Sequence, residues 1–223
     1  MFLRSASAIL LLLTAANVAS GQGLQSVVSP GKTDADGWPT SGAKLCLKDL
    51  PSVCFQMPDG SAGDVAYQFG LDPHSKPLNW PEGRTALIFD ATFSAGGSGS
   101  LTRYAIVRED GSGSAAHLSN LLPYVALTNN SDEAVLNEPQ ISPYPLLLTA
   151  DFIWDFKAGE THFSQHYFMI DAWQFDPEKD RYVLALSYKT AKKYNGLDAS
   201  DSVSVLDPER PEILHRLRSL SPR

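Results

Sequence analysis

The spacing of turn signals sets the strongest limit on the fold of this chain. From residue 43 onward, turns rich in glycine, proline, asparagine and aspartate recur about every 8 to 14 residues, which is close to the spacing of short strands. This spacing leaves no room for long helices, and neither a heptad pattern nor a long internal repeat is present. The chain is therefore predicted to be all-β and mainly antiparallel, arranged as a β-sandwich or barrel.

Several segments between these turns show the alternation of a half-buried strand. Residues 85–93 place apolar side chains at every second position, and residues 146–156 do the same. The clearest unit is a predicted hairpin, in which residues 166–175 and 181–190 are joined by a turn at 176–180. Both faces of its first strand are largely apolar.

Two helices are predicted beside these strands. Residues 114–122 can form a short helix with leucines on one side. Residues 207–217 fit a C-terminal amphipathic helix, with proline and acidic residues at its start and basic residues at its end. In that helix Ile213, Leu214 and Leu217 fall at helical spacing, so this face is predicted to pack onto a sheet.

The N-terminus predicts an export signal. A positive start, a short leucine-rich stretch and small residues make residues 1–21 a secretory signal peptide. The competing interpretation is a retained membrane anchor, but the apolar stretch has about a dozen residues and a membrane span needs about 20. Residues 22–42 are predicted to be a flexible leader, and residues 43–223 a single β-rich domain. The mature protein is expected to be exported, periplasmic or extracellular, without membrane insertion.

Composition excludes two broad classes. The chain has 223 residues, of which 43% are hydrophobic and 10% aromatic, so disorder throughout is excluded. Its formal net charge is −7, and it has no basic run longer than a pair. Nucleic-acid binding by phosphate neutralisation is therefore not expected.

Export also affects how the two cysteines are interpreted. Cys46 and Cys54 are the only cysteines, and two cysteines in an oxidising compartment are expected to pair. The alternative of a redox-active pair lacks the C-x-x-C spacing that lowers the pKa of a thiol. We therefore expect a structural disulfide between Cys46 and Cys54.

Residues 151–166 hold the densest group of candidate site residues. The candidates for ligand contact are Asp151, Trp154, Glu160, His162 and His166. Three of them, Glu160, His162 and His166, have side chains that suit zinc. However, the H-E-x-x-H arrangement is absent, and ligands four apart on a strand lie far from each other. Neither a metal nor a cofactor is expected. The alternative is that His162 and His166 are polar positions flanking the start of a strand.

Asp171 occupies an unusual position in the predicted hairpin. It shares a face with Tyr167, Met169, Trp173 and Phe175. The carboxyl is therefore either a buried, hydrogen-bonded acid with a raised pKa, or part of a concave binding face.

Four segments together resemble a known family. They are residues 46–58, with both cysteines, then 69–73, 149–154 and 211–217. These segments resemble a family of small exported proteins from acidobacteria-like soil bacteria, for which no activity is known. The resemblance implies a Gram-negative-type envelope, and hence the periplasm or the cell exterior. It carries over no catalytic residue.

The sequence favours a binding or accessory module for an envelope or extracellular glycan or protein partner. The alternative is a carboxylate-based hydrolase of an envelope or extracellular polymer. Such an enzyme would use groups near Asp151, Glu160 and His162, with Asp155 and Asp171 as further carboxylates for an acid/base pair. The two hypotheses differ in one structural requirement, because an enzyme needs titratable groups that converge.

Overall fold

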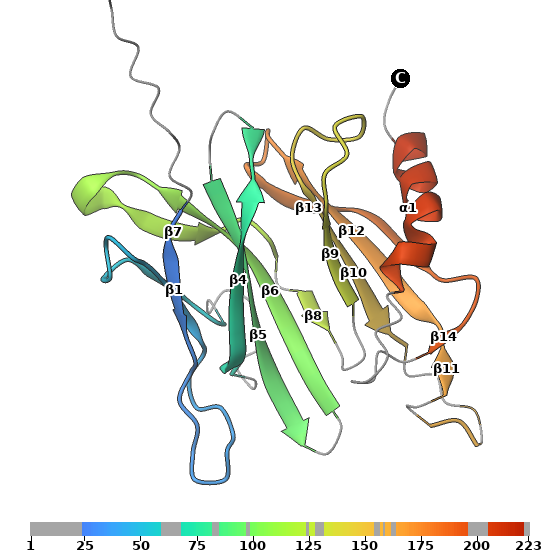
Figure 1. Ribbon diagram of the computed structural model, residues 1–223, viewed down its shortest axis with the longest axis horizontal. Coiled ribbons are helices and arrows are strands. Elements are labelled where there is room, and N and C mark those ends of the chain that lie inside the picture. The colour runs from blue at the N-terminus through green and yellow to red at the C-terminus, as the bar shows by residue number, and fades with distance from the viewer. Residues whose placement is uncertain are drawn as a thin grey trace, which may run out of the picture.

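The computed structural model describes residues 24–58, 68–81, 85–96, 99–123, 125–127, 132–153, 157, 159–161, 164–195 and 205–220. In these residues, antiparallel strands form four sheets and a single α-helix lies near the C-terminus. The predicted class, mainly antiparallel β with a C-terminal helix, is confirmed. Figure 1 shows β1 on one side of the molecule and α1 on the opposite side, with the two larger sheets between them.

The sheets are named by their order in the chain. The N-terminal sheet consists of β1 (Ser26–Ser29), β2 (Lys44–Leu47) and β3 (Cys54–Gln56). The central sheet consists of β4 (Leu71–Asn79), β5 (Thr85–Gly96), β6 (Gly99–Asp110), β7 (His117–Asn120) and β8 (Val125–Leu127). The C-terminal sheet has the order β13 (Arg181–Lys189), β12 (Phe168–Asp176), β10 (Leu146–Phe152) and β9 (Asp132–Leu136). Two short strands, β11 (Gln165–His166) and β14 (Tyr194–Asn195), form the fourth, and the helix α1 spans Leu206–Leu220.

The central sheet is buried on both faces. On β5, Leu87 and Phe89 pack against apolar residues of the N-terminal sheet, including Leu45. The intervening Ala86 and Ile88 pack against the C-terminal sheet. Alternate side chains of a strand point to opposite faces, so an almost continuous apolar run serves two cores at once.

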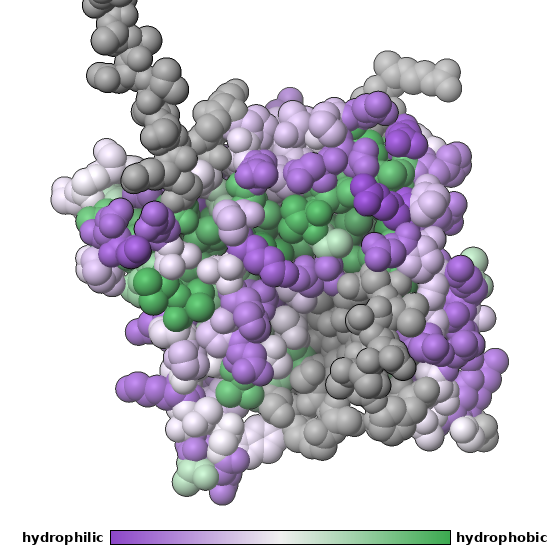
Figure 2. All heavy atoms as spheres, viewed as in Figure 1, coloured by the Kyte–Doolittle hydropathy of each residue, from purple (hydrophilic) through white to green (hydrophobic). Residues whose placement is uncertain are grey.

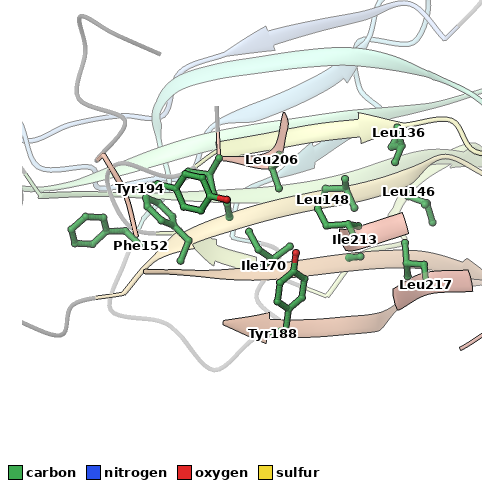
Figure 3. Close-up of a cluster of buried hydrophobic side chains, with 14 residues drawn as sticks. Leu136, Leu146, Leu148, Phe152, Ile170, Tyr188, Tyr194, Leu206, Ile213 and Leu217 are labelled. Carbon is green, nitrogen blue, oxygen red and sulfur yellow. The ribbon is translucent and has the colours of Figure 1, made fainter. Parts of the chain in front are cut away.

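The C-terminal sheet also has two distinct faces. Its outer face carries Leu146 and Leu148 of β10, which pack with Ile213 and Leu217 of α1 (Figure 3). Its inner face carries Leu147, which joins the cluster shared with the central sheet. The predicted packing of the helix onto a sheet is confirmed, with Ile213 and Leu217 buried and Leu214 only partly buried.

Arg108 links the two larger sheets. Its guanidinium donates two hydrogen bonds of 2.7 Å to the carboxylate of Asp180, in the turn between β12 and β13. A third hydrogen bond of 2.7 Å joins its Nε to Asp110, and the guanidinium also lies over the ring of Trp80. The hydrogen bonds that Arg108 donates to Asp180, and then to Asp110, raise the pKa of Arg108 despite its burial. The predicted hairpin turn is therefore fixed against β6.

The N-terminal segment differs from the flexible leader expected over residues 22–42. From residue 24 onward it belongs to the fold, because β1 pairs with β2 and Val28 packs against the core beside the central sheet. Gly31 donates a backbone hydrogen bond of 2.8 Å to Gly70, and a Cβ on Gly31 would lie 1.9 Å from the carbonyl oxygen of Ser41. This glycine permits close backbone approach, so a glycine-rich composition here does not indicate flexibility. The expected signal segment lies outside the described residues.

Two predicted elements are shorter or different in the structure. The helix expected over 114–122 is reduced to a single 3₁₀ turn at Gly113–Ala115, and His117–Asn120 forms β7 instead. Pairing with β6 outweighs the weak helical pattern of so short a segment. The strand expected over 146–156 ends at Phe152, and residues 154–156 lie outside the described part of the chain.

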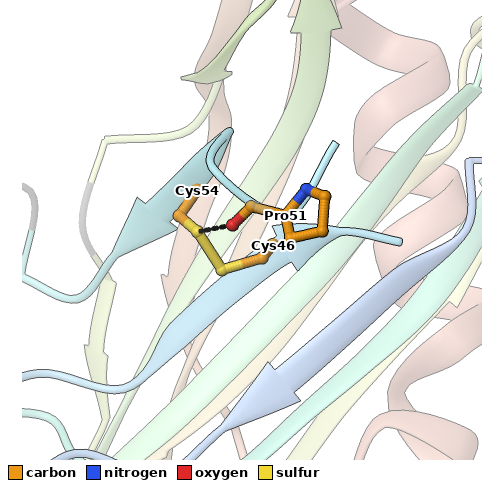
Figure 4. Close-up of a disulfide and its surroundings, with 3 residues drawn as sticks. All are labelled: Cys46, Pro51 and Cys54. Atoms are coloured by element: carbon orange, nitrogen blue, oxygen red, sulfur yellow. Dashed lines mark hydrogen bonds between the residues drawn. A yellow bond between two sulfur atoms is a disulfide. The ribbon is translucent and has the colours of Figure 1, made fainter. Parts of the chain in front are cut away.

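The disulfide between Cys46 and Cys54 is present (Figure 4). It joins β2 to β3 at directly paired positions, and the Sγ atom of Cys54 lies 3.3 Å from the carbonyl oxygen of Pro51. The two cysteines are separated by 8 positions. Closing so short a loop contributes about 2–3 kcal/mol by restricting the unfolded chain.

Hydrophobic side chains form a band across the face drawn in Figure 2, with hydrophilic side chains above and below it. Val135 of β9 is 36% exposed, although its neighbours in the apolar contact between the two larger sheets are buried.

Within the described residues, no helix is long and apolar enough to span a membrane.

Candidate functional site

The structure gives His166 a structural role. This side chain is 2% exposed, and its ring packs on Phe152 at 4.2 Å between centroids. Its Nε2 lies 2.7 Å from the carbonyl oxygen of Thr161, so it donates a hydrogen bond that fixes the preceding loop. His166 therefore lies just before β12, where the alternative interpretation places it, and its side chain is buried.

Glu160 is committed to an ion pair. Its Oε1 accepts a hydrogen bond of 2.6 Å from Nζ of Lys193, and its Oε2 accepts one of 3.1 Å from the backbone of Lys157. The hydrogen bond from Lys193 is the main cause that lowers the pKa of Glu160. A carboxylate held ionised in this way cannot serve as a proton donor near neutral pH.

Asp151 does not converge with His166. It lies on the inner face of β10, whereas His166 contacts Phe152, which belongs to the outer-face cluster. Trp154 and His162 lie outside the described residues. Within the described ranges, no group of three histidine, cysteine or acidic side chains is placed to hold a metal.

Polar side chains instead gather in a row on the inner face of the C-terminal sheet. The β-sheet register pairs Glu133 of β9 with Thr149 of β10, Thr149 with Asp171 of β12, and Asp171 with Ser187 of β13. Directly paired residues of antiparallel strands project from the same face, so these four side chains form one row. We call this set, together with Asp151, the inner polar row.

A row of apolar side chains borders the inner polar row. It runs across the same four strands and consists of Val135, Leu147, Trp173 and Leu184. Leu184 is 47% exposed, and Trp173 is partly buried. The inner face therefore changes from apolar to polar between two neighbouring rows of side chains.

Asp171 is the most unusual group on this face. Its side chain is partly buried, and no described residue donates a hydrogen bond to its Oδ1. Burial raises the pKa of Asp171, the charge of Asp151 raises it further, and a hydrogen bond from Ser187 opposes both. The possibility of an acid with a raised pKa, left open by the sequence, is therefore supported.

Trp173 presents a complementary polar atom. Its Nε1 is buried and has no acceptor among the described residues. It stands two positions after Asp171 on β12, so both side chains project from the inner face. One strand thus presents a buried acceptor and a buried donor side by side, each without a partner in the described chain.

The facing sheet contributes further polar groups. Lys76 of β4 donates a hydrogen bond of 3.0 Å to Glu133, which links the central sheet to the inner polar row. On β5, Asp90 is hydrogen-bonded to His74 at 3.1 Å, and burial is the main cause that raises its pKa. The sequence offered one signal for this group, because Asp90 interrupts an otherwise apolar strand on the face that also carries Ile88.

The raised pKa of Asp171 predicts a pH-dependent effect on stability. Above its folded pKa, the ionised carboxylate is less favourable in the fold than in the unfolded chain, and this cost disappears as the pH falls below the ordinary value of 3.8. The Asp171→Asn variant is therefore expected to melt at a higher temperature than the wild type at pH 7. The difference should shrink toward pH 3.8.

Melting curves between pH 3 and pH 7 measure this effect, and Asp176→Asn is the matched control. Hydrogen bonding from Lys179 is the main cause that lowers the pKa of Asp176, so its carboxylate stabilises the fold at neutral pH. The control is expected to melt at a lower temperature at pH 7. An Asp171→Asn variant that is less stable than the wild type at pH 7 would contradict the assignment.

Comparison with known proteins gives no match to a protein family, to a curated protein or to a solved structure.

Proposed function

We propose that this protein is an exported binding module for an envelope or extracellular glycan, and that the inner face of the C-terminal sheet binds it. The observation that carries the proposal is the adjacent pair of unpartnered polar atoms, Oδ1 of Asp171 and Nε1 of Trp173. Buried polar groups are almost always hydrogen-bonded, so such a pair calls for a ligand or ordered water. A sugar carries several hydroxyls, each of which can donate and accept, so it has partners for both atoms.

The neighbouring side chains support a sugar ligand. The inner polar row places the carboxylate of Asp151 and the hydroxyl of Ser187, which donates to Asp171, on the same face, while Trp173 and Leu184 offer apolar surface. A sugar ring has hydroxyls at its edge and C–H groups on its faces, so it suits a surface with both kinds of group.

A protein partner is less well supported. Stable protein interfaces bury on the order of 800 Å² on each side, around a hydrophobic core. Among the described residues, the exposed large hydrophobic side chains stand on separate elements; they are Val27, Trp38, Val135, Leu184 and Leu220. Only Val135 and Leu184 share one face, at the two ends of its apolar row.

Export is supported by three features. The disulfide of Cys46 and Cys54 is stable in oxidising compartments and rare in the cytosol. The N-terminal segment has the pattern of a secretory signal, and the family resemblance points to an envelope. A glycan of that envelope, or one outside the cell, is the ligand that such a location makes available.

Co-sedimentation with purified peptidoglycan sacculi tests the proposal, together with calorimetric titration of chito- and cello-oligosaccharides. The wild type is expected to bind at least one of these probes. Trp173→Phe removes the donor but keeps an aromatic ring, and Asp171→Ala removes the acceptor. Each variant is expected to bind about tenfold more weakly, as is typical when one buried hydrogen bond is lost.

Asp176→Asn serves as the control, because Asp176 lies in the hairpin turn at the end of β12 and is not part of the inner polar row. It is expected to bind like the wild type. The proposal fails if no probe is retained by the wild type. It also fails if both inner-face variants, shown to be folded, bind as tightly as the wild type.

Hydrolysis of such a polymer is the second candidate function. It is favoured by the electrostatic coupling of Asp151 and Asp171, in which the charge of the first raises the pKa of the second. Glycosidases use two carboxyl groups in this way, one protonated as the acid and one ionised. Asp171 would protonate the leaving oxygen, while Asp151 acts as the base or nucleophile.

The Asp171→Asn variant separates the two functions. Asparagine keeps an acceptor oxygen but has no carboxyl proton to donate. If the protein is a hydrolase, the wild type releases new reducing ends from the polymer, and this variant binds without releasing them. If the wild type releases none from any polymer that it binds, the hydrolase is excluded and binding remains.

A further inference from the structure

A second polar site lies on the opposite side of the C-terminal sheet, between α1 and the end of β13. It is a groove of about 300 Å³, at the lower end of the size range of small-molecule sites. Seven residues line it: Tyr188, Ala191, Lys192, Pro208, Glu209, Glu212 and Arg216. The helix contributes Pro208, Glu212 and Arg216 at intervals of four, so they lie along one face.

The floor of the groove is held by a hydrogen-bonded network. Glu209 is 7% exposed, and its carboxylate accepts hydrogen bonds from the hydroxyls of Tyr188, at 2.8 Å, and Tyr194. Burial raises the pKa of both tyrosines, and the hydrogen bond to Glu209 raises it further. Both hydroxyls therefore remain protonated donors, and Glu209 is fully engaged.

One wall of the groove is fixed by a stacked cation. The guanidinium of Arg216 lies 4.3 Å from the ring centroid of Tyr188, and its Nε donates a hydrogen bond of 2.7 Å to Oε1 of Glu212. A guanidinium stacked on a ring and held at Nε presents its two terminal nitrogens in a defined direction.

The charged groups of the groove that still have atoms without a partner include both cations and a carboxylate. Among the described residues, the terminal nitrogens of Arg216 and Nζ of Lys192 have no hydrogen-bonding or ion-pair partner, although Nζ lies 5.0 Å from the ring centroid of Tyr194. In the same part of the chain, Oε2 of Glu212 has no partner. The groove thus offers free donors beside a free carboxylate oxygen.

We propose that this groove binds a small zwitterion of the α-amino-acid type, with an apolar side chain. Its lining carries two cations and two carboxylates, so a simple anion would meet Glu209 and Glu212, and a simple cation would meet Lys192 and Arg216. A zwitterion satisfies both signs: its carboxylate pairs with Arg216 and Lys192, and its ammonium group with Glu212. Tyr188, Ala191 and Pro208 supply the apolar wall. This inference does not depend on the glycan-binding proposal.

Calorimetric titration of the purified protein with L-leucine tests the inference. Two comparison probes each lack one charge: 4-methylpentanoate has no ammonium group, and isopentylamine has no carboxylate. L-leucine is expected to bind saturably, and each comparison probe to bind at least about tenfold more weakly. Equal binding of L-leucine and 4-methylpentanoate, or no saturable binding of L-leucine, overturns the inference.

Three variants locate the binding site. Lys192→Gln and Arg216→Gln are each expected to weaken L-leucine binding by about tenfold, because each removes a charged partner of the carboxylate. Lys192→Gln alters no hydrogen bond of its side chain among the described residues, so its result stands even if Arg216→Gln disturbs the helix. Arg218→Gln is the control, because Arg218 is exposed on α1 and does not line the groove. Wild-type affinity in Lys192→Gln, or in a folded Arg216→Gln, contradicts the assignment.

Discussion

Replacement of Ile213 by alanine is expected to lower the free energy of unfolding by about 2–5 kcal/mol, the cost of removing a fully buried aliphatic side chain. Ile213 has no exposed surface and lies between α1 and the outer face of the C-terminal sheet (Figure 3). The loss combines the transfer of apolar atoms out of water with the cavity that remains under the helix. Urea denaturation followed by tryptophan fluorescence measures it.

The matched control is the neighbouring substitution Leu214→Ala. The sequence alone places both residues on the apolar side of the helix, but the structure leaves Leu214 only partly buried. Its replacement removes less buried surface, so a clearly smaller loss is expected. Equal losses for the two variants would mean that α1 packs through a different face from the one described.

Replacement of Glu209 by alanine is expected to destabilise the protein by about 3–5 kcal/mol, because hydrogen bonds to a charged group contribute about 1.5–3 kcal/mol each. Tyr188 and Tyr194 both donate their hydroxyl hydrogens to this carboxylate, and all three residues are buried. Removing Glu209 leaves two buried hydroxyls without their acceptor and loosens the first turns of α1. The helical signal in far-UV circular dichroism, followed through denaturation, measures the effect.

Glu209→Gln separates the lost charge from the lost shape. Glutamine fills the same volume, but its amide offers one acceptor oxygen where the carboxylate offers two. An intermediate loss of stability is therefore expected. If the alanine variant is as stable as the wild type, the two tyrosine hydroxyls have other acceptors and the network does not hold the helix.

Local patterns predict the elements whose partners are close in sequence. The hairpin of β12 and β13 and its turn are confirmed near their predicted bounds, because its two strands face each other across five turn residues. The C-terminal helix is confirmed because its acidic first turn, its basic last turn and its apolar spacing all lie within one short segment. The bulge between Ala172 and Trp173, which brings Leu184 onto the face of Trp173, has no counterpart in the sequence pattern.

The elements that differ depend on distant partners. Val28 is ordered by packing against the central sheet, and composition alone cannot reveal such a contact. The segment at 117–120 becomes a strand because β6 offers an open edge, which outweighs the weak helical pattern.

The same distinction applies to the candidate site. The sequence makes Glu160 a candidate site carboxylate, and its ion pair with Lys193 does not show in the local pattern because Lys193 lies 33 positions away. The sequence places His166 at the start of a strand, but its burial against Phe152 depends on a contact that is made only in the folded chain. Asp171 is a clearer sequence signal for the site than Glu160 or His166, because an acidic residue that shares a strand face with aromatic residues is unusual in any fold. The sheet register then brings Glu133 and Ser187 into its row.

The central sheet affects how the protein can change over evolution. Because β5 supplies side chains to two separate cores, one substitution there disturbs two packing arrangements at once. The outer layers are less constrained, since α1 contributes to a single cluster. Drift in sequence is therefore expected to be slowest in β5, while the outward-facing side chains of α1 can change as the middle layer keeps its sequence.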